Sequence, residues 1–365
     1  MVGEEGSLEG MVIDQNFWLG KRVLLTGHTG FKGSWLGLWL LQLGARVTGC
    51  ALEPASSENL FQLSRLADDL EHSVVDIRDS EAVRELVKRT RPEIIIHMAA
   101  QSLVRYSYAH PLETYQTNVM GTLHLLEAVR NVDCVQSCIV VTSDKCYENL
   151  ERPEPYRETD SLGGHDPYSS SKACAEVLTS SWYRSYFAGA EHSPSLATVR
   201  AGNVLGGGDW AEDRIVPDLV RAMAAGESLK LRNPSAVRPW QHVLEPLSGY
   251  LLLAQALAMD GNEYAGAWNF GPDAENLLPV SELADRLVAC WGDGASWLAA
   301  TGEEPHEAGL LALDSAKAQQ QLGWRPRLDV DSLSASIVHW YREQLNGADA
   351  RQLCLQQIAD FEAAA

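Results

Sequence analysis

Basic residues are scarce in this 365-residue sequence, and long apolar runs are missing from it. Lys and Arg together number 29 against 49 Asp and Glu, which gives a net charge of −20 at pH 7. Because a surface this acidic repels phosphate backbones, the composition argues against a nucleic-acid partner. No apolar run is long enough to span a bilayer, so no membrane segment is expected.

Metal-binding spacings and a basic leader are missing as well. The seven cysteines are scattered, and no Cys-x-x-Cys or His-x-Cys pattern occurs. We therefore expect free thiols in a reducing cytoplasm and no bound metal. Residues 1–15 carry three glutamates and no basic segment, so we interpret them as a flexible acidic extension and not as a signal peptide.

Short apolar runs alternate with helical patterns over the first two hundred residues. Strands are expected at 22–26, 46–52, 73–75, 94–98, 138–142 and 196–200, and helices at 33–43, 80–90, 112–130 and 168–187. This alternation predicts an α/β fold of the Rossmann type over residues 16–200, in which a doubly wound parallel sheet has helices on both faces.

The alternation ends near Ala201, and Gly206-Gly207-Gly208 marks a loop there. We predict a smaller, mixed α/β substrate-binding domain over residues 201–345, from which a segment of about 235–275 returns to the first domain. Residues 346–365 are expected to form a C-terminal helix or tail.

A glycine-rich turn follows the first predicted strand directly. Its sequence is Gly27-His28-Thr29-Gly30-Phe31-Lys32-Gly33. In such a strand–turn–helix context the first glycine makes the tight turn, the second lets the backbone approach a pyrophosphate, and the third permits close packing of helix on strand. The helix N-terminus then offers N–H groups to the anion. We predict that this turn, with Thr29, Phe31 and Lys32 among its residues, binds a dinucleotide.

Two acidic positions are candidates for contacts with the adenosine half. Glu53 stands at the distance expected for an acid that binds the ribose, although Pro54 follows it and could turn its side chain elsewhere. No arginine stands beside Glu53 to receive a 2′-phosphate, which favours NAD over NADP; Lys32 could do so from the glycine turn. Asp76 and Ile77 end the third strand, where an adenine edge would lie, but Asp76 could equally be a turn-forming aspartate.

Tyr168 and Lys172 are four residues apart in a predicted helix and therefore share one face. A phenol titrates near pH 10, so a tyrosine that acts as a base near neutrality needs a stabilised phenolate. A lysine one turn away and a cationic nicotinamide ring can stabilise the phenolate. Lowering the pKa of the tyrosine by about three units corresponds to about 4 kcal/mol. We predict that Tyr168 is a catalytic base. The alternative is a solvated Tyr/Lys pair on an ordinary helix.

At this point the sequence resembles the extended short-chain dehydrogenase/reductase family, over about residues 17–344. The motifs that carry the resemblance are the glycine turn, His97-Met-Ala-Ala100, Asn118-Val-Met-Gly121-Thr122, Ser143, Tyr168-x-x-x-Lys172 and Leu322-Gly-Trp-Arg-Pro326. Within the family it is most similar to dehydratases that act on nucleotide sugars, on the stretches Gly27–Trp35, Thr142–Asn149, Gly202–Trp210 and Arg238–Val243.

The resemblance implies a redox-neutral elimination from a hexose, with CDP-glucose as the substrate and NAD as a cofactor that stays bound. Tyr168 would take the proton of the C4 hydroxyl while a hydride leaves C4; water is then lost across C5 and C6, and the hydride returns to C6. Ser143 and Lys172 belong to the same catalytic set. Asp144 would protonate the departing C6 hydroxyl, and Lys145, once neutral, would take the C5 proton. Lysine at this position departs from the Asp-Glu pair of dTDP-glucose dehydratases.

The resemblance also implies further contacts. The cofactor-binding positions that it adds are Ala99, Ala100, Gln101 and Asn118. Arginine forks suit a diphosphate, and the candidates for substrate binding are Asn203, Arg214, Arg232, Arg238 and His242, of which Arg214, Arg232 and His242 could instead be structural. Helices 112–130 and 168–187 carry broad apolar faces, and such helices pair across a two-fold axis in this family, so a homodimer or higher homo-oligomer is expected.

Two alternatives remain open. The substrate could carry another nucleotide, dTDP or GDP, or the reaction could be an epimerisation, although a plain epimerase would lack the Asp144–Lys145 pair. A non-catalytic NAD-binding scaffold is the alternative from another class.

Overall fold

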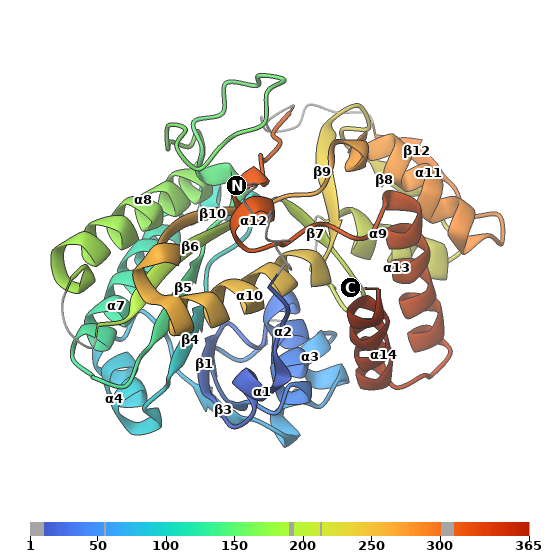
Figure 1. The fold of residues 1–365 in the computed structure, drawn as a ribbon. Coiled ribbons are helices and arrows are strands. Elements are labelled where there is room, and N and C mark those ends of the chain that lie inside the picture. Colours follow the sequence, from blue (N-terminus) through green and yellow to red (C-terminus); the bar gives the residue numbers. More distant parts are fainter. Residues whose placement is uncertain (1–10, 55, 190–192, 212–213, 301–309, 365) are drawn as a thin grey trace, which may run out of the picture.

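A seven-stranded parallel sheet organises the larger part of the molecule (Figure 1). The computed structural model describes residues 11–54, 56–189, 193–211, 214–300 and 310–364, so most of the expected acidic extension lies outside the described residues. From one edge to the other the strands are β3 (Glu71–Val74), β2 (Arg46–Ala51), β1 (Arg22–Thr26), β4 (Ile94–His97), β5 (Ser137–Val141), β6 (Ser195–Ala201) and β10 (Gly266–Phe270).

The order of these strands reverses between β1 and β4, as in doubly wound nucleotide-binding sheets. All neighbours pair in parallel; Val23, for example, lies opposite Val47 on one side and Ile94 on the other. The prediction of a Rossmann-type α/β fold is confirmed. Strand β10 comes from beyond residue 201 and completes the sheet beside β6.

Helices cover both faces of the sheet. On one face α2 (Phe31–Gln42) and α10 (Leu244–Asp260) are buried almost throughout, because the sheet lies on one side of them and more helices lie on the other. On the other face lie α4 (Ser80–Thr90), α7 (Thr122–Arg130) and α8 (Pro167–Trp182), whose apolar sides form a second core cluster with the sheet. Figure 1 shows these three helices on the side of the sheet opposite α10.

The predicted helix 112–130 is interrupted. The structure has α6 (Pro111–Tyr115), a π-turn η2 (Gln116–Gly121) and then α7. Single π-turns inside helices are common at functional sites because they redirect a side chain. Here the π-turn contains Asn118, one of the expected cofactor contacts.

The smaller lobe stands over the carboxyl ends of the strands. It contains a sheet of β11 (Leu277–Pro279), β9 (Val237–His242) and β7 (Asn203–Leu205), and a strand pair of β12 (Trp297–Ala299) with β8 (Leu229–Leu231). Its helices are α9 (Ile215–Ala224), α11 (Val280–Trp291) and α13 (Val330–Leu345).

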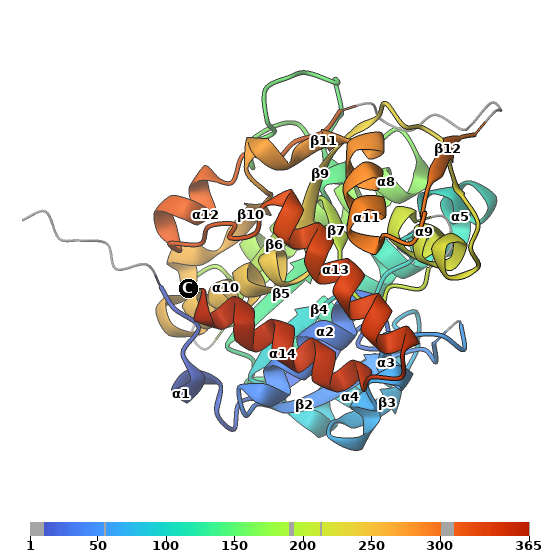
Figure 2. The same ribbon diagram turned by 90° about the vertical axis from the view of Figure 1, so that its right-hand side faces the viewer.

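The last helix, α14 (Ala350–Ala363), joins the two lobes. It lies beside α13 and in front of α2 (Figure 2). Trp39 of α2 donates a hydrogen bond from Nε1 to Glu362 at 2.7 Å, and its ring meets Phe361 edge-on at 5.9 Å. The predicted C-terminal helix therefore packs on the larger lobe while its neighbour α13 packs in the smaller one.

Short elements complete the chain. They are α1 (Gln15–Trp18), α3 (Leu60–Leu63), η1 (Leu66–Asp68), α5 (Val104–Ala109), η3 (Asp144–Cys146), η4 (Tyr183–Phe187), η5 (Gly261–Tyr264), η6 (Ala274–Asn276) and α12 (Ala316–Gln321). Among the described residues, no helix has the length and apolarity needed to cross a membrane.

Candidate active site

A large cleft lies between the carboxyl ends of the sheet strands and the smaller lobe. Its volume is about 2200 Å³. Cavities for single small ligands are roughly 300–1,000 Å³, so this cleft can hold a dinucleotide and a second nucleotide together. Loops that follow β1 to β6 line one wall, and residues of β7, β8, β9 and α9 line the other.

The glycine turn forms the floor of this cleft. Gly27 has φ of +77°, and a Cβ atom there would lie 2.7 Å from the backbone N of Ala99. A Cβ atom on Gly33 would lie 2.1 Å from the carbonyl O of Gly27. No side chain caps the N-terminus of α2 at Gly30, so the N–H groups of its first turn are available to an anion. These features fit the pyrophosphate of a dinucleotide, together with the size of the cleft.

The two acidic candidates for the adenosine half both line the cleft. The side chain of Glu53 is 68% exposed, and its carboxylate lies 3.8 Å from His72 Nε2, so it remains accessible to a ribose. Asp76 receives a fork of hydrogen bonds from Arg78, with Nη2 at 2.6 Å, and this contact lowers the pKa of the Asp76 carboxyl. Asp76 is therefore already engaged as the anchor of its turn, and Ile77 beside it is buried.

Lys32 lies elsewhere than its place in the glycine turn suggested. Its Nζ donates to the hydroxyl of Tyr250 at 3.1 Å, in the middle of α10. The pKa of Lys32 is lowered to about 7, mainly by burial and in addition by the cations of Lys172 and Arg214. The amine thus faces the catalytic residues, and this geometry does not support the alternative in which Lys32 receives a 2′-phosphate.

Tyr168 and Lys172 lie on the buried side of α8 and line the cleft. Burial raises the pKa of Tyr168 to about 12, while a hydrogen bond with Ser143 and the charge of Arg214 act in the opposite direction. Lys172 donates from Nζ to the carbonyl O of Val141 at 3.0 Å. Burial lowers the pKa of Lys172 to about 8, opposed by the nearby Glu176 carboxylate.

The expected acid/base pair follows β5. Ser143 caps the short helix η3, because its Oγ accepts from the backbone N of Lys145 at 3.2 Å and donates to Asp144 Oδ1 at 2.9 Å. The Asp144 side chain is 4% exposed, whereas that of Lys145 is 35% exposed, and Lys145 Nζ lies 3.9 Å from Asp144 Oδ1. All five expected catalytic residues therefore line one cleft.

Four of the five expected substrate contacts line the opposite wall: Asn203, Arg214, Arg232 and Arg238. Arg214 precedes α9, and its guanidinium is held by Asp209 at 2.9 Å.

His242 does not reach the cleft. It is 1% exposed, its ring packs edge-on against Trp35 at 5.9 Å, and burial lowers its pKa to about 4. The expectation that His242 contacts substrate is not supported, because β9 carries it down into the core between the lobes.

Asn118 is also buried away from the cleft. Its side chain accepts from the backbone N of Gln101 and donates to the Gln101 carbonyl, both at 2.9 Å, and donates to Ser171 at 2.8 Å. It therefore holds the loop of Ala99, Ala100 and Gln101, which do line the cleft, whereas Asn118 itself is not among the residues that line it.

Sequence reasoning missed several residues of the site. Lys230 of β8 and Arg221 of α9 line the substrate wall. The alternation Leu229-Lys230-Leu231 could have indicated a short strand that buries its leucines and directs Lys230 to the opposite side. The buried ion pair of Glu176 with Arg200 was also missed, although Glu176 stands eight residues after Tyr168 on the same helical face.

The chain matches a known family over most of its length. A family model described as GDP-mannose 4,6 dehydratase matches residues 24–267. The CDP-glucose 4,6-dehydratase of Salmonella typhimurium is 49% identical over 97% of this chain and 99% of its own length. The protein therefore belongs to this dehydratase family, within the extended short-chain dehydrogenases/reductases that its motifs resemble.

More distant relatives and solved structures agree with this assignment. A dTDP-glucose 4,6-dehydratase of Xanthomonas campestris is 29% identical over 87% of this chain and 92% of its own length. The structure of dTDP-glucose 4,6-dehydratase from Streptomyces venezuelae, solved with NAD, superposes with a TM-score of 0.74 at 25% identity and covers 89% of this chain and 98% of that one. The UDP-glucose 4-epimerase of Thermotoga maritima gives 0.75 at 25% identity and covers 88% and 99%.

Proposed function

We propose that this protein is a CDP-glucose 4,6-dehydratase, which converts CDP-D-glucose to CDP-4-keto-6-deoxy-D-glucose and water with bound NAD. The observation that carries the proposal is the Asp144–Lys145 pair, which lines the same cleft as Tyr168. An oxidoreductase or epimerase of this family needs the tyrosine, but only an elimination needs an added acid and base. The full-length similarity to a CDP-glucose 4,6-dehydratase supports the choice of nucleotide.

The chain's own residues divide the proton transfers among them. When bound, NAD would supply the hydride chemistry, by which C4 of the sugar is oxidised for a time and C6 is reduced. Tyr168 takes the proton of the C4 hydroxyl, and Ser143, which is hydrogen-bonded to it, orients the phenol. The ketone at C4 acidifies the C5 hydrogen. Lys145 takes the C5 proton and Asp144 gives a proton to the departing C6 hydroxyl. Lys145 returns its proton to C5 as C6 is reduced, and the proton taken by Tyr168 replaces the one lost by Asp144 by way of solvent, so the net change is the loss of one water.

The phenol of Tyr168 must become more acidic before it can act as a base. Burial raises the pKa of the Tyr168 phenol to about 12. To bring that pKa near 7 requires about 7 kcal/mol of preferential stabilisation of the phenolate. The value of about 12 already includes the lowering by the hydrogen bond with Ser143 and by Arg214, so the further stabilisation would come from a cationic nicotinamide held in the buried cleft.

The Asp144–Lys145 contact places the acid and the base of the elimination side by side. Lys145 Nζ lies 3.9 Å from Asp144 Oδ1, and the Asp144 side chain is the more deeply buried of the two. Both groups line the cleft that the sugar would fill.

The positions of the contacts are part of the proposal. The glycine turn, Thr29, Phe31, Glu53 and the loop of Ala99 to Gln101 hold the cofactor, and Asn203, Arg214, Arg232 and Arg238 hold the nucleotide sugar. We also propose a homodimer through the run of α6, η2 and α7 and through α8, where Leu112, Met120 and Val177 are 79%, 43% and 57% exposed. Sedimentation of the pure protein tests the dimer.

We place the enzyme in the cytoplasm and in deoxysugar biosynthesis, including that of lipopolysaccharide O-antigen. The seven cysteines are free thiols, which supports a reducing compartment.

The direct test is to incubate pure, NAD-loaded protein with CDP-glucose, dTDP-glucose, GDP-mannose and UDP-glucose separately. We expect a 4-keto-6-deoxy product from CDP-glucose, identified by NMR, and much slower turnover of the others. Preferred conversion of another nucleotide sugar would contradict the choice of nucleotide. A C4 epimer without loss of water would identify an epimerase, and folded, NAD-binding protein that converts none of them would indicate a non-catalytic scaffold.

A further inference from the structure

Two segments of the catalytic centre meet at one buried ion pair. Glu176 of α8 and Arg200 of β6 each have side chains 3% exposed. Arg200 donates from Nε to Glu176 Oε1 and from Nη2 to Glu176 Oε2, both at 2.8 Å. Glu176 also accepts from the hydroxyls of Thr142 and Thr198, so each of its oxygens has two donors.

The ion pair holds both ends of the segment that carries the acid/base residues, 142–147, which we call the catalytic segment. At its start, Thr142 donates to Glu176. At its end, Arg200 Nη1 donates to the Tyr147 hydroxyl at 2.6 Å, and that hydroxyl donates to Asn269 Oδ1 at 2.8 Å. Ser143, Asp144 and Lys145 lie between these two attachments.

The same ion pair is adjacent to Tyr168 and Lys172, the catalytic residues on α8. Tyr168, Lys172 and Glu176 follow at intervals of four along α8, so they share one buried face. We propose that the Glu176–Arg200 pair is a positioning device, which fixes the catalytic segment relative to Tyr168 and Lys172 so that elimination keeps pace with oxidation. This inference rests on the proposed dehydratase function.

The location of the pair argues for this role over simple stabilisation. A buried ion pair is costly to desolvate, and well-packed apolar residues often replace one without loss of stability. Here the same four side-chain donors could not be satisfied by an apolar residue. One of these donors, Thr142, begins the catalytic segment, and Arg200, which supplies two others, also holds the far end of that segment through Tyr147. Since a misplacement of about 1 Å can reduce a rate about 100-fold, such attachments matter for turnover.

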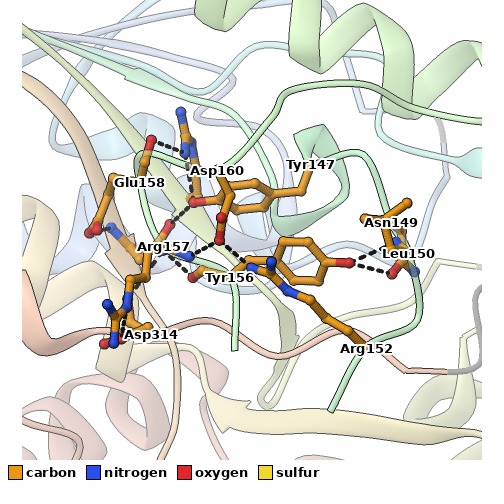
Figure 3. Close-up of polar contacts among 11 residues, drawn as sticks. Tyr147, Asn149, Leu150, Arg152, Tyr156, Arg157, Glu158, Asp160 and Asp314 are labelled. Carbon is orange, nitrogen blue, oxygen red and sulfur yellow. Dashed lines mark hydrogen bonds and ion pairs between the residues drawn. The ribbon is translucent and has the colours of Figure 1, made fainter. Parts of the chain in front are cut away.

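Single-atom changes can cut each attachment separately. Tyr147→Phe removes the hydroxyl that meets Arg200, and Thr142→Val removes the hydroxyl that meets Glu176. Tyr156→Phe is a matched control, because its ring lies 5.2 Å from that of Tyr147 but its hydroxyl bonds to Asn149 and Leu150. Figure 3 shows the two hydroxyls pointing in opposite directions. Thr179→Val is the second control, because the Thr179 hydroxyl has no partner among the described residues.

We expect kcat with CDP-glucose to fall about tenfold in Tyr147→Phe and Thr142→Val, as for the loss of one hydrogen bond that orients a reacting group, while KM stays within about twofold. We also expect near-ultraviolet absorbance of reduced nicotinamide to build up during turnover. Oxidation at C4 uses Tyr168 and continues, whereas the elimination lags. The controls should match wild type in both measurements.

Glu176→Gln adds a pH measurement. Lys172 is faced by Glu176 on α8, Cys146 on the catalytic segment, Lys32 on α2 and His97 on β4. Because Glu176 opposes the effect of burial, its loss should lower the pKa of Lys172 further. The alkaline limb of the kcat profile should therefore move to lower pH. If this variant does not fold, the two hydroxyl variants decide the question.

The outcomes separate the two proposals. Wild-type protein that does not dehydrate CDP-glucose overturns the proposed function. Active wild type, with Tyr147→Phe and Thr142→Val that show lower melting temperatures but unchanged kcat and no build-up of reduced cofactor, overturns the positioning role.

Discussion

Lys32 gives a quantitative test of the electrostatics in the cleft. Its amine lies beside Tyr250 and is lowered in pKa from 10.5 to about 7, first by burial and then by the cations of Lys172 and Arg214. The difference corresponds to about 5 kcal/mol of unfavourable free energy for the charged amine. Because the side chain of Lys32 is only partly buried, solvent screens part of this effect. We expect a measurable pH-dependent difference of roughly 3 kcal/mol in the free energy of unfolding. The perturbation is Lys32→Met, which keeps the length and removes the charge.

The sign of the effect follows from proton linkage. Below about pH 7 the amine is charged in the folded and unfolded chains, and the folded protein bears the whole cost. Between pH 7 and 10.5 the unfolded chain retains a proton that the folded protein has released, so the free energy of unfolding rises with pH. Lys32→Met lacks this dependence. Its stability relative to wild type should therefore fall by about 2–3 kcal/mol between pH 6 and pH 10.

The assay is urea denaturation of the NAD-free protein at several pH values, with the difference between variant and wild type taken at each pH. The difference cancels the titration of groups that do not interact with Lys32, such as the cysteines, because it is common to both proteins. Loss of the hydrogen bond with Tyr250 lowers the free energy of unfolding of Lys32→Met by about 1 kcal/mol at every pH. It therefore does not change how the difference between variant and wild type depends on pH. Lys230→Met, at an exposed lysine of β8, is the control and should change stability by less than about 0.5 kcal/mol. A difference for Lys32→Met that is independent of pH would refute the reasoning.

Three further changes test the site and its support. Tyr168→Phe should lower kcat about 10²- to 10⁴-fold while NAD binding, measured by fluorescence titration, is kept; unchanged turnover would remove Tyr168 from the mechanism. Asp144→Asn should lower product formation by a similar factor but still allow reduced nicotinamide to form, and loss of both signals would contradict its assignment to the elimination. Removal of residues 349–365 uncovers α2 and deletes the buried side chains of Ile358 and Phe361, so the free energy of unfolding should fall by at least about 3 kcal/mol in urea, and an unchanged midpoint would show that α14 does not support the larger lobe.

The strands and the glycine turn were predictable because their signals are local. A strand buried on both faces of a parallel sheet is a continuous apolar run, such as Ile94–His97, and the turn after β1 needs glycine at Gly27 for its positive φ. The interruption of the helix by the π-turn at Gln116–Gly121 was not predictable. In this turn the Asn118 side chain forms hydrogen bonds with the backbone N–H and carbonyl of Gln101, seventeen residues earlier, and no local sequence pattern contains that contact.

Side-chain direction was the weakest part of the sequence reasoning. Arg238 and His242 stand on the same side of β9 by strand alternation, yet Arg238 lines the cleft and His242 is buried. The strand begins at the open wall and ends between the lobes, as its increasing burial shows. The direction of Lys32 similarly depends on α10, more than two hundred residues away, which no local pattern contains.

The overall acidity of the chain and the charge of the cleft must be considered separately. Among the described residues, ten Lys and Arg line the cleft, namely Lys32, Arg78, Arg105, Lys145, Lys172, Arg214, Arg221, Lys230, Arg232 and Arg238. Ten Asp and Glu line it as well: Glu53, Glu58, Asp76, Glu113, Asp144, Glu148, Glu151, Asp166, Asp209 and Asp218. The lining is therefore neutral by formal count, while the whole chain carries −20. Since the excess negative charge lies outside the cleft, the same protein can repel a polyanion at its surface and still bind the diphosphates of two nucleotides inside.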